Sequence, residues 1–314
     1  MLEKHLPFKR NFLDLNGQQY HYINEGEGEP VVMIHGNPSW SFYYRNVVTS
    51  LAKTHQCIVP DHIGCGLSDK PDDEHYDYTL TQRIDDLETL LDHLNVRENI
   101  TLIVHDWGGM IGLGYAARYP ERIKKLVILN TAAFHLPDTK VFPWALWLGR
   151  NTGLGALLVR GFNAFSGIAS IIGVKRKAMD AEIRQMYVAP FNTWSNRIST
   201  LRFIQDIPLK PDDRNYQLVS DIAASLSKFS NLPMLICWGM KDFVFDHHFL
   251  TQWQQRFPDA VVHKFDDCGH YILEDAKEEV VPFIHDFIVN YALPSKNNVK
   301  PSESSNLSTD QAIE

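Results

Sequence analysis

The chain has 314 residues, of which 44% are hydrophobic and 22% are charged, a balance typical of a folded domain with a sizeable core. Thirty basic against 38 acidic side chains give a net charge of −8. This balance argues against nucleic acid as a partner, because phosphate binding needs a basic surface, and it gives no overall attraction to anionic lipid.

The N-terminal residues, the apolar runs and the cysteine spacing indicate the cellular compartment. Residues 1–10 hold three basic side chains and no apolar core, so we expect no signal peptide. No apolar run approaches the ~20 residues that cross a bilayer, so no membrane span is predicted. The cysteines, Cys57, Cys65, Cys237 and Cys268, lack disulfide or zinc spacing. We therefore expect free thiols in a cytoplasmic protein that holds no metal and no other cofactor.

Apolar runs of strand length alternate with helical patterns along the chain. Helical patterns occur for example at Leu80–Leu94 and Met110–Tyr119, and continuous apolar runs such as Leu126–Leu129 are typical of buried parallel strands. The alternation predicts an α/β fold with a parallel sheet covered on both faces. In chain order, the expected strands are Tyr20–Ile23, Val31–Ile34, Cys57–Val59, Thr101–Val104, Leu126–Leu129, Met234–Trp238 and Val261–Phe265.

This alternation stops after Asn130 and returns only at Met234. The helical, aromatic, Gly-interrupted stretch between them predicts a helical cap at residues 131–231, inserted between core segments 1–130 and 232–293. Residues 294–314 are rich in Ser, Asn and Glu and are expected to form a disordered tail. Two interpretations of the apolar stretch Val141–Val174 stay open: an amphipathic cap packed on the core, or an exposed apolar face that admits a lipid-like substrate.

The strongest motif is His105-Asp106-Trp107-Gly108-Gly109, which follows an expected strand and opens a helix. A sharp strand-to-helix turn of this kind can present a nucleophile, and small residues let the chain turn tightly. The pattern Gly-x-Ser-x-Gly is absent from the chain, so the turn presents a carboxylate, which is ionised at neutral pH and attacks without a base. Such a group suits displacement at an sp³ carbon or opening of a strained ring. The alternative is that Asp106 only caps the helix. The motifs described next disfavour it, because they supply a histidine and a second acid.

Two later motifs supply a histidine and a second acid. Gly269 lets the loop after the last expected strand bend, so that His270 projects toward the nucleophile. Asp242 follows the strand Met234–Trp238 and is placed to orient the imidazole and stabilise its protonated form. The order nucleophile, acid, histidine predicts that Asp106, Asp242 and His270 form one catalytic set.

A fourth motif, His35-Gly36-Asn37-Pro38, follows the strand Val31–Ile34. We expect the backbone N–H groups of Asn37 and Trp107 to face a developing negative charge, and their side chains to donate toward a leaving anion. Plain packing is the alternative for Trp107. The turn Asp61–Ser68 is interpreted as structural, and Asp246-His247-His248 as a helix start rather than a metal site.

Together these motifs and Asp61-x-x-Gly-x-Gly-x-Ser68 resemble the haloalkane dehalogenase and epoxide hydrolase branch of the α/β-hydrolases, over nearly the whole chain to Leu293. Within that branch, the segments Ala189–Arg197 and Phe203–Leu209 are closer to the β-lactone decarboxylases of bacterial long-chain olefin biosynthesis. The resemblance implies the α/β-hydrolase fold, with a mostly parallel eight-stranded sheet, flanking helices and an inserted helical cap.

It also implies a reaction and partners. A cis-β-lactone with two alkyl chains would lose CO₂ and yield a cis-alkene, after Asp106 opens the ring to a covalent adduct that then fragments. Attack on a ring carbon or on the carbonyl stays open, as does whether His270 moves a proton or only positions charge. A small hydrophobic substrate suits an apolar cap, because each buried methylene contributes ~0.8 kcal/mol. Assembly with the β-lactone synthetase and reductase of the pathway is implied as well.

Three rival functions remain at this point. Haloalkane dehalogenation fits Asp106, Asn37 and Trp107, with Trp144 as a candidate second halide donor. Epoxide hydrolysis calls for a pair of cap tyrosines, for which the cap offers only Tyr187 and Tyr216. A non-catalytic ligand-binding protein is disfavoured, because it has no need of a complete nucleophile, acid and histidine.

Overall fold

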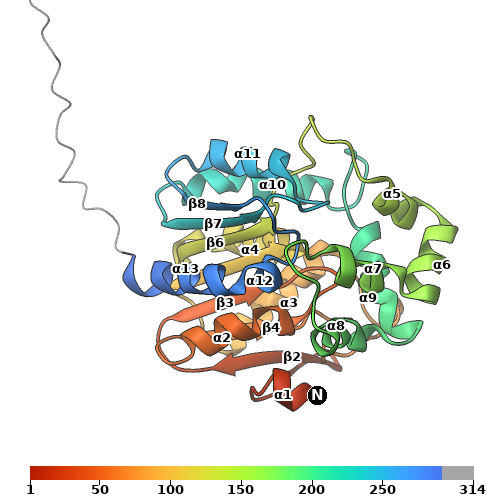
Figure 1. Ribbon diagram of the computed structural model, residues 1–314, viewed down its shortest axis with the longest axis horizontal. Helices are drawn as coiled ribbons and strands as arrows, with labels where there is room; N and C mark the ends of the chain where they lie inside the picture. Colours follow the sequence, from red (N-terminus) through yellow and green to blue (C-terminus); the bar gives the residue numbers. More distant parts are fainter. Residues whose placement is uncertain (292–314) are drawn as a thin grey trace, which may run out of the picture.

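An eight-stranded, mostly parallel sheet forms the centre of the computed structural model, which describes residues 1–291 (Figure 1). The spatial order is β1-β2-β4-β3-β5-β6-β7-β8, with β1 and β2 antiparallel to their neighbours and β3 to β8 parallel. The strands are β1 (Asn11–Leu15), β2 (Gln18–Glu25), β3 (Pro30–Ile34), β4 (Gln56–Pro60), β5 (Ile100–Asp106), β6 (Ile123–Thr131), β7 (Met234–Gly239) and β8 (Val261–Phe265). The predicted fold class and all seven expected strands are confirmed.

Strand β1 was not predicted, because its residues alternate between half-buried and exposed and form no apolar run. It pairs with β2 through a two-residue turn, Asn16-Gly17, in which both residues have positive φ. Asn-Gly is a strong hairpin signal, so the sequence did contain the cue.

The helices and the short 3-10 segments (η) connect these strands. Helix α4 begins at Trp107, directly after Asp106 and three residues before the predicted start. The elements are α1 (Leu2–His5), η1 (Ser41–Tyr44), α2 (Arg45–Leu51), α3 (Leu80–His93), α4 (Trp107–Arg118), η2 (Pro120–Arg122), α5 (Trp144–Asn151), α6 (Gly153–Phe162), α7 (Ala164–Ile172), α8 (Ala181–Val188), η3 (Ala189–Phe191), η4 (Ser195–Arg197), α9 (Ile198–Gln205), α10 (Tyr216–Ser225), η5 (Leu226–Phe229), α11 (His247–Arg256), α12 (Ile272–Asp275) and α13 (Lys277–Asn290).

Successive side chains of the central strands enter two separate cores, one on each face of the sheet. In β5, Leu102 and Val104 pack in the core formed with α3 and α4, whereas Ile103 packs in the core formed with α2 and α13. Burial on both faces explains why these strands appear as unbroken apolar runs in the sequence.

Every element between β6 and β7 is helical or 3-10. Helices α5 to α9 lie to one side of the sheet, where α5, α6 and α9 share a small core of their own (Figure 1). Helix α10 packs instead against α4, with Ile222 close to Gly114. The last part of the 131–231 segment therefore covers the sheet rather than the cavity. The predicted boundary at 293 and the predicted tail 294–314 lie outside the described residues.

None of the helices in residues 1–291 is by itself long and apolar enough to cross a membrane, although α6 and α7, bent by 73° at their junction, pass that test as a pair. All four cysteines are free and buried.

A hydrogen bond from the cap reaches a buried ion pair of the core. Arg45 of α2 binds Glu274 of α12 through two nitrogens, at 2.5 and 2.8 Å, and the Tyr187 hydroxyl of α8 donates to the same carboxylate at 2.6 Å. Tyr187 thus has a structural role in the cap, and its hydroxyl is already engaged.

Tyr187→Phe should lower the free energy of unfolding by about 1–3 kcal/mol, because it removes a buried hydrogen bond to a charged group. Urea denaturation measures this. The matched control is Tyr216→Phe, which keeps an aromatic ring stacked on His135. Its free energy of unfolding should stay within about 0.5 kcal/mol of the parent. Equal stability of both variants would contradict the tethering role.

Candidate active site

A sharp turn at the end of β5 exposes the side chain of Asp106 to a cavity. Asp106 has φ 51° and ψ −126°, a strained conformation for a residue with a side chain, and α4 starts at the next residue. Close packing demands glycine two residues later, since a Cβ on Gly108 would lie 1.9 Å from the Ile34 carbonyl oxygen. The sequence therefore folds here into a turn that holds one carboxylate at the carboxyl edge of the sheet.

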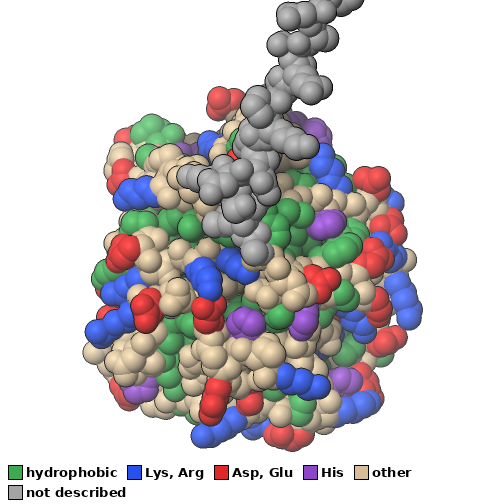
Figure 2. Space-filling model, turned by 90° about the vertical axis from the view of Figure 1, so that its left-hand side faces the viewer, with side chains coloured by type: hydrophobic (Ala, Val, Ile, Leu, Met, Phe, Trp, Pro, Cys, Tyr) green, Lys and Arg blue, Asp and Glu red, His purple; other side chains and the backbone are tan. Residues whose placement is uncertain are grey.

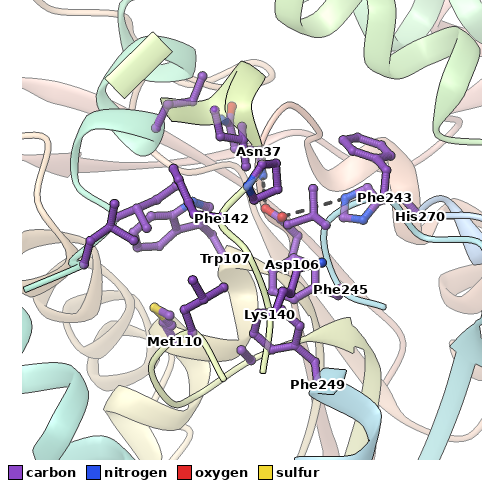
Figure 3. A pocket seen from close by; sticks show the side chains of 18 of the residues that line it. Asn37, Asp106, Trp107, Met110, Lys140, Phe142, Phe243, Phe245, Phe249 and His270 are labelled. Carbon is purple, nitrogen blue, oxygen red and sulfur yellow. Dashed lines mark hydrogen bonds and ion pairs between the residues drawn. The ribbon is translucent and has the colours of Figure 1, made fainter. Parts of the chain in front are cut away.

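The two oxygens of this carboxylate have different surroundings. The backbone N–H of Asn37 donates to Oδ1 at 2.6 Å, and the N–H of Trp107 also bonds the carboxylate. Oδ2 faces His270, whose Nε2 lies 3.7 Å away (Figure 3). Oδ1 is thus held by a backbone donor, and Oδ2 faces the imidazole.

His270 and Asp242 meet from two later loops. Nδ1 of His270 lies 2.8 Å from Oδ2 of Asp242, and both side chains are buried. Nε2 is consequently directed toward Asp106, so the three residues singled out by sequence form one continuous set.

The pKa values of Asp106 and His270 are both raised, but for different reasons. Burial raises the pKa of Asp106 from its ordinary 3.8 to about 6, although His270 and the N–H groups of Asn37 and Trp107 act in the other direction. Burial alone would lower the pKa of His270, but the carboxylates of Asp242 and Asp106 outweigh it and raise that pKa above 6.5. The pair therefore carries an anion beside a readily protonated imidazole.

Two supporting residues were not singled out by sequence. The Asn130 side chain bonds both the N–H and the carbonyl of Gly239, which fixes the start of the loop that carries Asp242. His105 Nε2 contacts the His270 carbonyl at 2.9 Å, and its ring stacks on Tyr43. The available signal was position: each lies at the carboxyl end of a central strand.

An apolar cavity opens above Asp106 (Figure 3). Asn37, Trp107 and His270 line it beside Asp106. The rest of its wall is largely aliphatic and aromatic, with contributions from α4, α5, α7, α9 and the loop after β7: Met110, Phe134, Leu136, Phe142, Leu146, Phe165, Ile204, Ile207, Leu209, Phe243, Val244, Phe245 and Phe249. The cavity is suited to a hydrophobic ligand with little hydrogen-bonding capacity.

Several sequence hypotheses about the cap and the surface have a clear outcome. Trp144 as a halide donor is wrong, because its side chain is 78% exposed on the outer side of α5 and does not line the cavity. Neither Tyr187 nor Tyr216 lines the cavity, so the tyrosine pair of an epoxide hydrolase is missing there. Asn37 lines the cavity, but its side-chain amide donates to the Thr200 carbonyl. Asp246 caps the N-terminus of α11, as expected for a helix start, and it also pairs with Lys140.

Comparison with known proteins agrees with this architecture. The family model for the alpha/beta hydrolase fold matches residues 29–277. The chain belongs to the α/β-hydrolase family.

This α/β-hydrolase is 74% identical to a protein of Shewanella oneidensis named cis-3-alkyl-4-alkyloxetan-2-one decarboxylase, over 92% of the chain and 91% of that relative. A protein of the same name from Xanthomonas campestris is 52% identical over 85% of the chain and 91% of that relative. Among solved structures, a haloalkane dehalogenase variant from Bradyrhizobium elkanii superposes with a TM-score of 0.79 at 25% identity, covering 90% of this chain and 96% of the other.

Replacing Asp106 by Asn should stabilise this α/β-hydrolase by roughly 1–3 kcal/mol at neutral pH, because the buried carboxylate is more costly when ionised. An acid whose folded pKa is raised loses stability as pH rises from 3.8 to about 6. The gain of the variant should therefore appear across that window and vanish below it. Thermal unfolding at several pH values measures it, and a variant that is less stable than the parent at pH 7 would refute the account.

Proposed function

We propose that this α/β-hydrolase converts a cis-3-alkyl-4-alkyloxetan-2-one to a cis-alkene and CO₂, with Asp106 as the covalent nucleophile. The observation that carries the proposal is 74% identity, over 92% of the chain, to a relative of that name. The match to the haloalkane dehalogenase structure, at 25% identity, is far more distant.

The cavity supports a substrate with two alkyl chains. Its apolar walls extend away from Asp106 on the side of α5 and α7 and on the side of Phe245 and Phe249 (Figure 3). Burying each methylene there contributes ~0.8 kcal/mol. The long chains would therefore supply the binding energy that places the small polar ring against the nucleophile.

In the first step, Oδ2 of Asp106 attacks C4 of the ring with inversion, forming a C4–Oδ2 ester bond as the C4–O1 bond breaks. O1 leaves with the ring carbonyl as a free carboxylate on C3. Relief of ring strain drives this displacement. The negative charge passes from the Asp106 carboxylate to the carboxylate of the opened substrate. The N–H of Asn37 keeps Oδ1 in place throughout, and the N–H of Trp107 stabilises the same carboxylate.

In the second step, the electron pair of the bond between C3 and the carboxylate forms the C3–C4 double bond. CO₂ leaves, and the C4–Oδ2 bond breaks to restore the Asp106 carboxylate. Inversion followed by anti elimination retains the cis relation of the two alkyl groups. The two reaction steps together consume no water and transfer no proton.

His270 and Asp242 would act through charge. An imidazolium 3.7 Å from Oδ2 stabilises Asp106 as the departing carboxylate, and Asp242 keeps the imidazole both oriented and protonated. In this assignment His270 need not activate water, in contrast to a hydrolase of the same fold.

Haloalkane dehalogenation is the second candidate. It is favoured by Trp107 and Asn37, which both line the cavity beside Asp106.

We also include in the proposal a cytoplasmic location, which suits four free thiols, and assembly with the lactone synthetase and reductase of an olefin pathway.

A direct comparison of two substrates separates the candidates. We expect the purified chain to release alkene from a long-chain cis-β-lactone, monitored by gas chromatography, and Asp106→Asn to lose turnover by roughly 10³-fold or more. The variant's retained fold, checked by thermal unfolding, is the control. Fast bromide release from 1-bromobutane without any alkene from the lactone would refute the proposal in favour of dehalogenation.

Isotope incorporation tests the two steps themselves. After many turnovers of the lactone in H₂¹⁸O, the peptide that contains Asp106 should carry no ¹⁸O, because C–O cleavage returns both original oxygens. Hydrolysis of an alkyl-enzyme ester would label this carboxylate, so any turnover of 1-bromobutane by the same enzyme supplies the positive control. Label appearing during lactone turnover, measured by mass spectrometry, would overturn the elimination step.

A further inference from the structure

The outer side of the cap is unusually apolar. Of the thirteen large hydrophobic side chains that are exposed in residues 1–291, ten lie between positions 141 and 194. We call this set the apolar cap face, and it consists of Val141, Trp144, Trp147, Leu154, Leu157, Phe162, Ile168, Ile171, Ile172 and Trp194. Large contiguous apolar surfaces mark interaction sites.

These residues come from elements that pack on one another. Helix α6 packs against both α5 and α7, and the three lie at the edge of the molecule away from the sheet (Figure 1). The Trp194 ring lies 3.6 Å and the Leu157 side chain 3.3 Å from the position that a Cβ of Gly161 would occupy, so Trp194 covers α6. The face therefore extends over all three helices.

Two of the helices are apolar on both sides. In α5, Leu146 lines the cavity while Trp144 and Trp147 are exposed. In α7, Phe165 and Ala169 line the cavity, while Ile168, Ile171 and Ile172 point outward. A cap helix surrounded by water on its outer side would carry polar residues there.

The segment that carries nine of these ten residues has charged side chains of one sign. Residues 141–179 contain no Asp or Glu but five basic side chains, in a chain whose net charge is −8. Arg150 and Arg176 pair with acids from other segments. Arg160, Lys175 and Lys177 form no ion pair within the described part of the chain. By contrast, the face opposite the cap intermingles both signs of charge (Figure 2).

We propose that the apolar cap face docks on the surface of an anionic phospholipid bilayer. Helices α6 and α7 have only 10 and 9 residues and meet at a bend of 73°, so each is too short to cross and the pair can lie in the interfacial plane. Exposed tryptophans prefer that interface, and unpaired basic side chains are attracted to anionic headgroups.

This docking gives the cavity a hydrophobic supply route. The inner sides of α5 and α7 line the cavity and their outer sides would contact lipid, so a water-insoluble ligand need not pass through water to reach Asp106. Membrane binding itself does not rest on the identity of the reaction.

Vesicle flotation with the full chain tests the proposal. The protein should float with vesicles of phosphatidylcholine and phosphatidylglycerol, and less with phosphatidylcholine alone or at high salt. The variant Trp144→Ser/Leu154→Ser/Phe162→Ser should partition roughly tenfold less or worse, because these side chains supply the apolar contact but do not line the cavity. The matched control, Phe12→Ser/Val289→Ser, removes exposed apolar side chains elsewhere and should float like the parent.

A charge variant keeps the test independent of any folding defect in the triple variant. Lys177→Glu should weaken flotation with the anionic vesicles and leave the weaker binding to phosphatidylcholine unchanged. The proposal is overturned if the parent fails to float with anionic vesicles, or if the folded triple variant floats equally well. A parent that does not float but self-associates, as judged by analytical ultracentrifugation, with the triple variant monomeric, overturns it in favour of contact between copies of this chain.

A second readout rests on the proposed function. Turnover of a long-chain β-lactone dissolved in vesicles should fall in the triple variant, whereas turnover of a short-chain, water-soluble β-lactone should not. Failure of both substrates in the parent would count against the reaction, while flotation would still decide the docking.

Discussion

The burial of one carboxylate is the constraint around which the site is built. An ionised Asp106 in an apolar cavity is costly, and burial raises its pKa to about 6. The anion is retained because two backbone N–H groups and the imidazole of His270 face it. This arrangement demands a loop that approaches very closely, since a Cβ on Gly36 would lie 2.0 Å from Oδ1 of Asp106.

An apolar cavity affects competing chemistries differently. A carboxylate that is buried and fixed by preorganised donors is a strong nucleophile, whichever bond it attacks. Hydrolysis then still needs a water molecule delivered to the ester, at the side where His270 Nε2 stands 3.7 Å from Oδ2. Decarboxylative fragmentation needs only electrons already in the substrate. The same three residues can therefore serve either reaction, and the deciding factor is the ligand that the apolar walls select.

The core and the candidate site were predictable because short-range sequence determines them. Strands buried on both faces appear as continuous apolar runs, and Asp106, Asp242 and His270 each directly follow such a strand or lie within a few residues of its end. Parallel strands bring their carboxyl ends to one edge, so residues far apart in sequence converge there. The supporting contact of Asn130 with Gly239 was not predictable, because it depends on the register of two neighbouring strands.

The cap shows why orientation was harder to predict than helicity. A 3.6-residue period identifies side chains that share a face, but it does not say which face is turned inward when both are apolar. Trp144, the candidate second halide donor, is exposed, and packing of α5 on α9 turns Leu146 toward the cavity instead. That ambiguity has a physical origin. Residues on both sides of α5 and α7 are apolar because the inner sides border a hydrophobic cavity and the outer sides are suited to a second apolar environment.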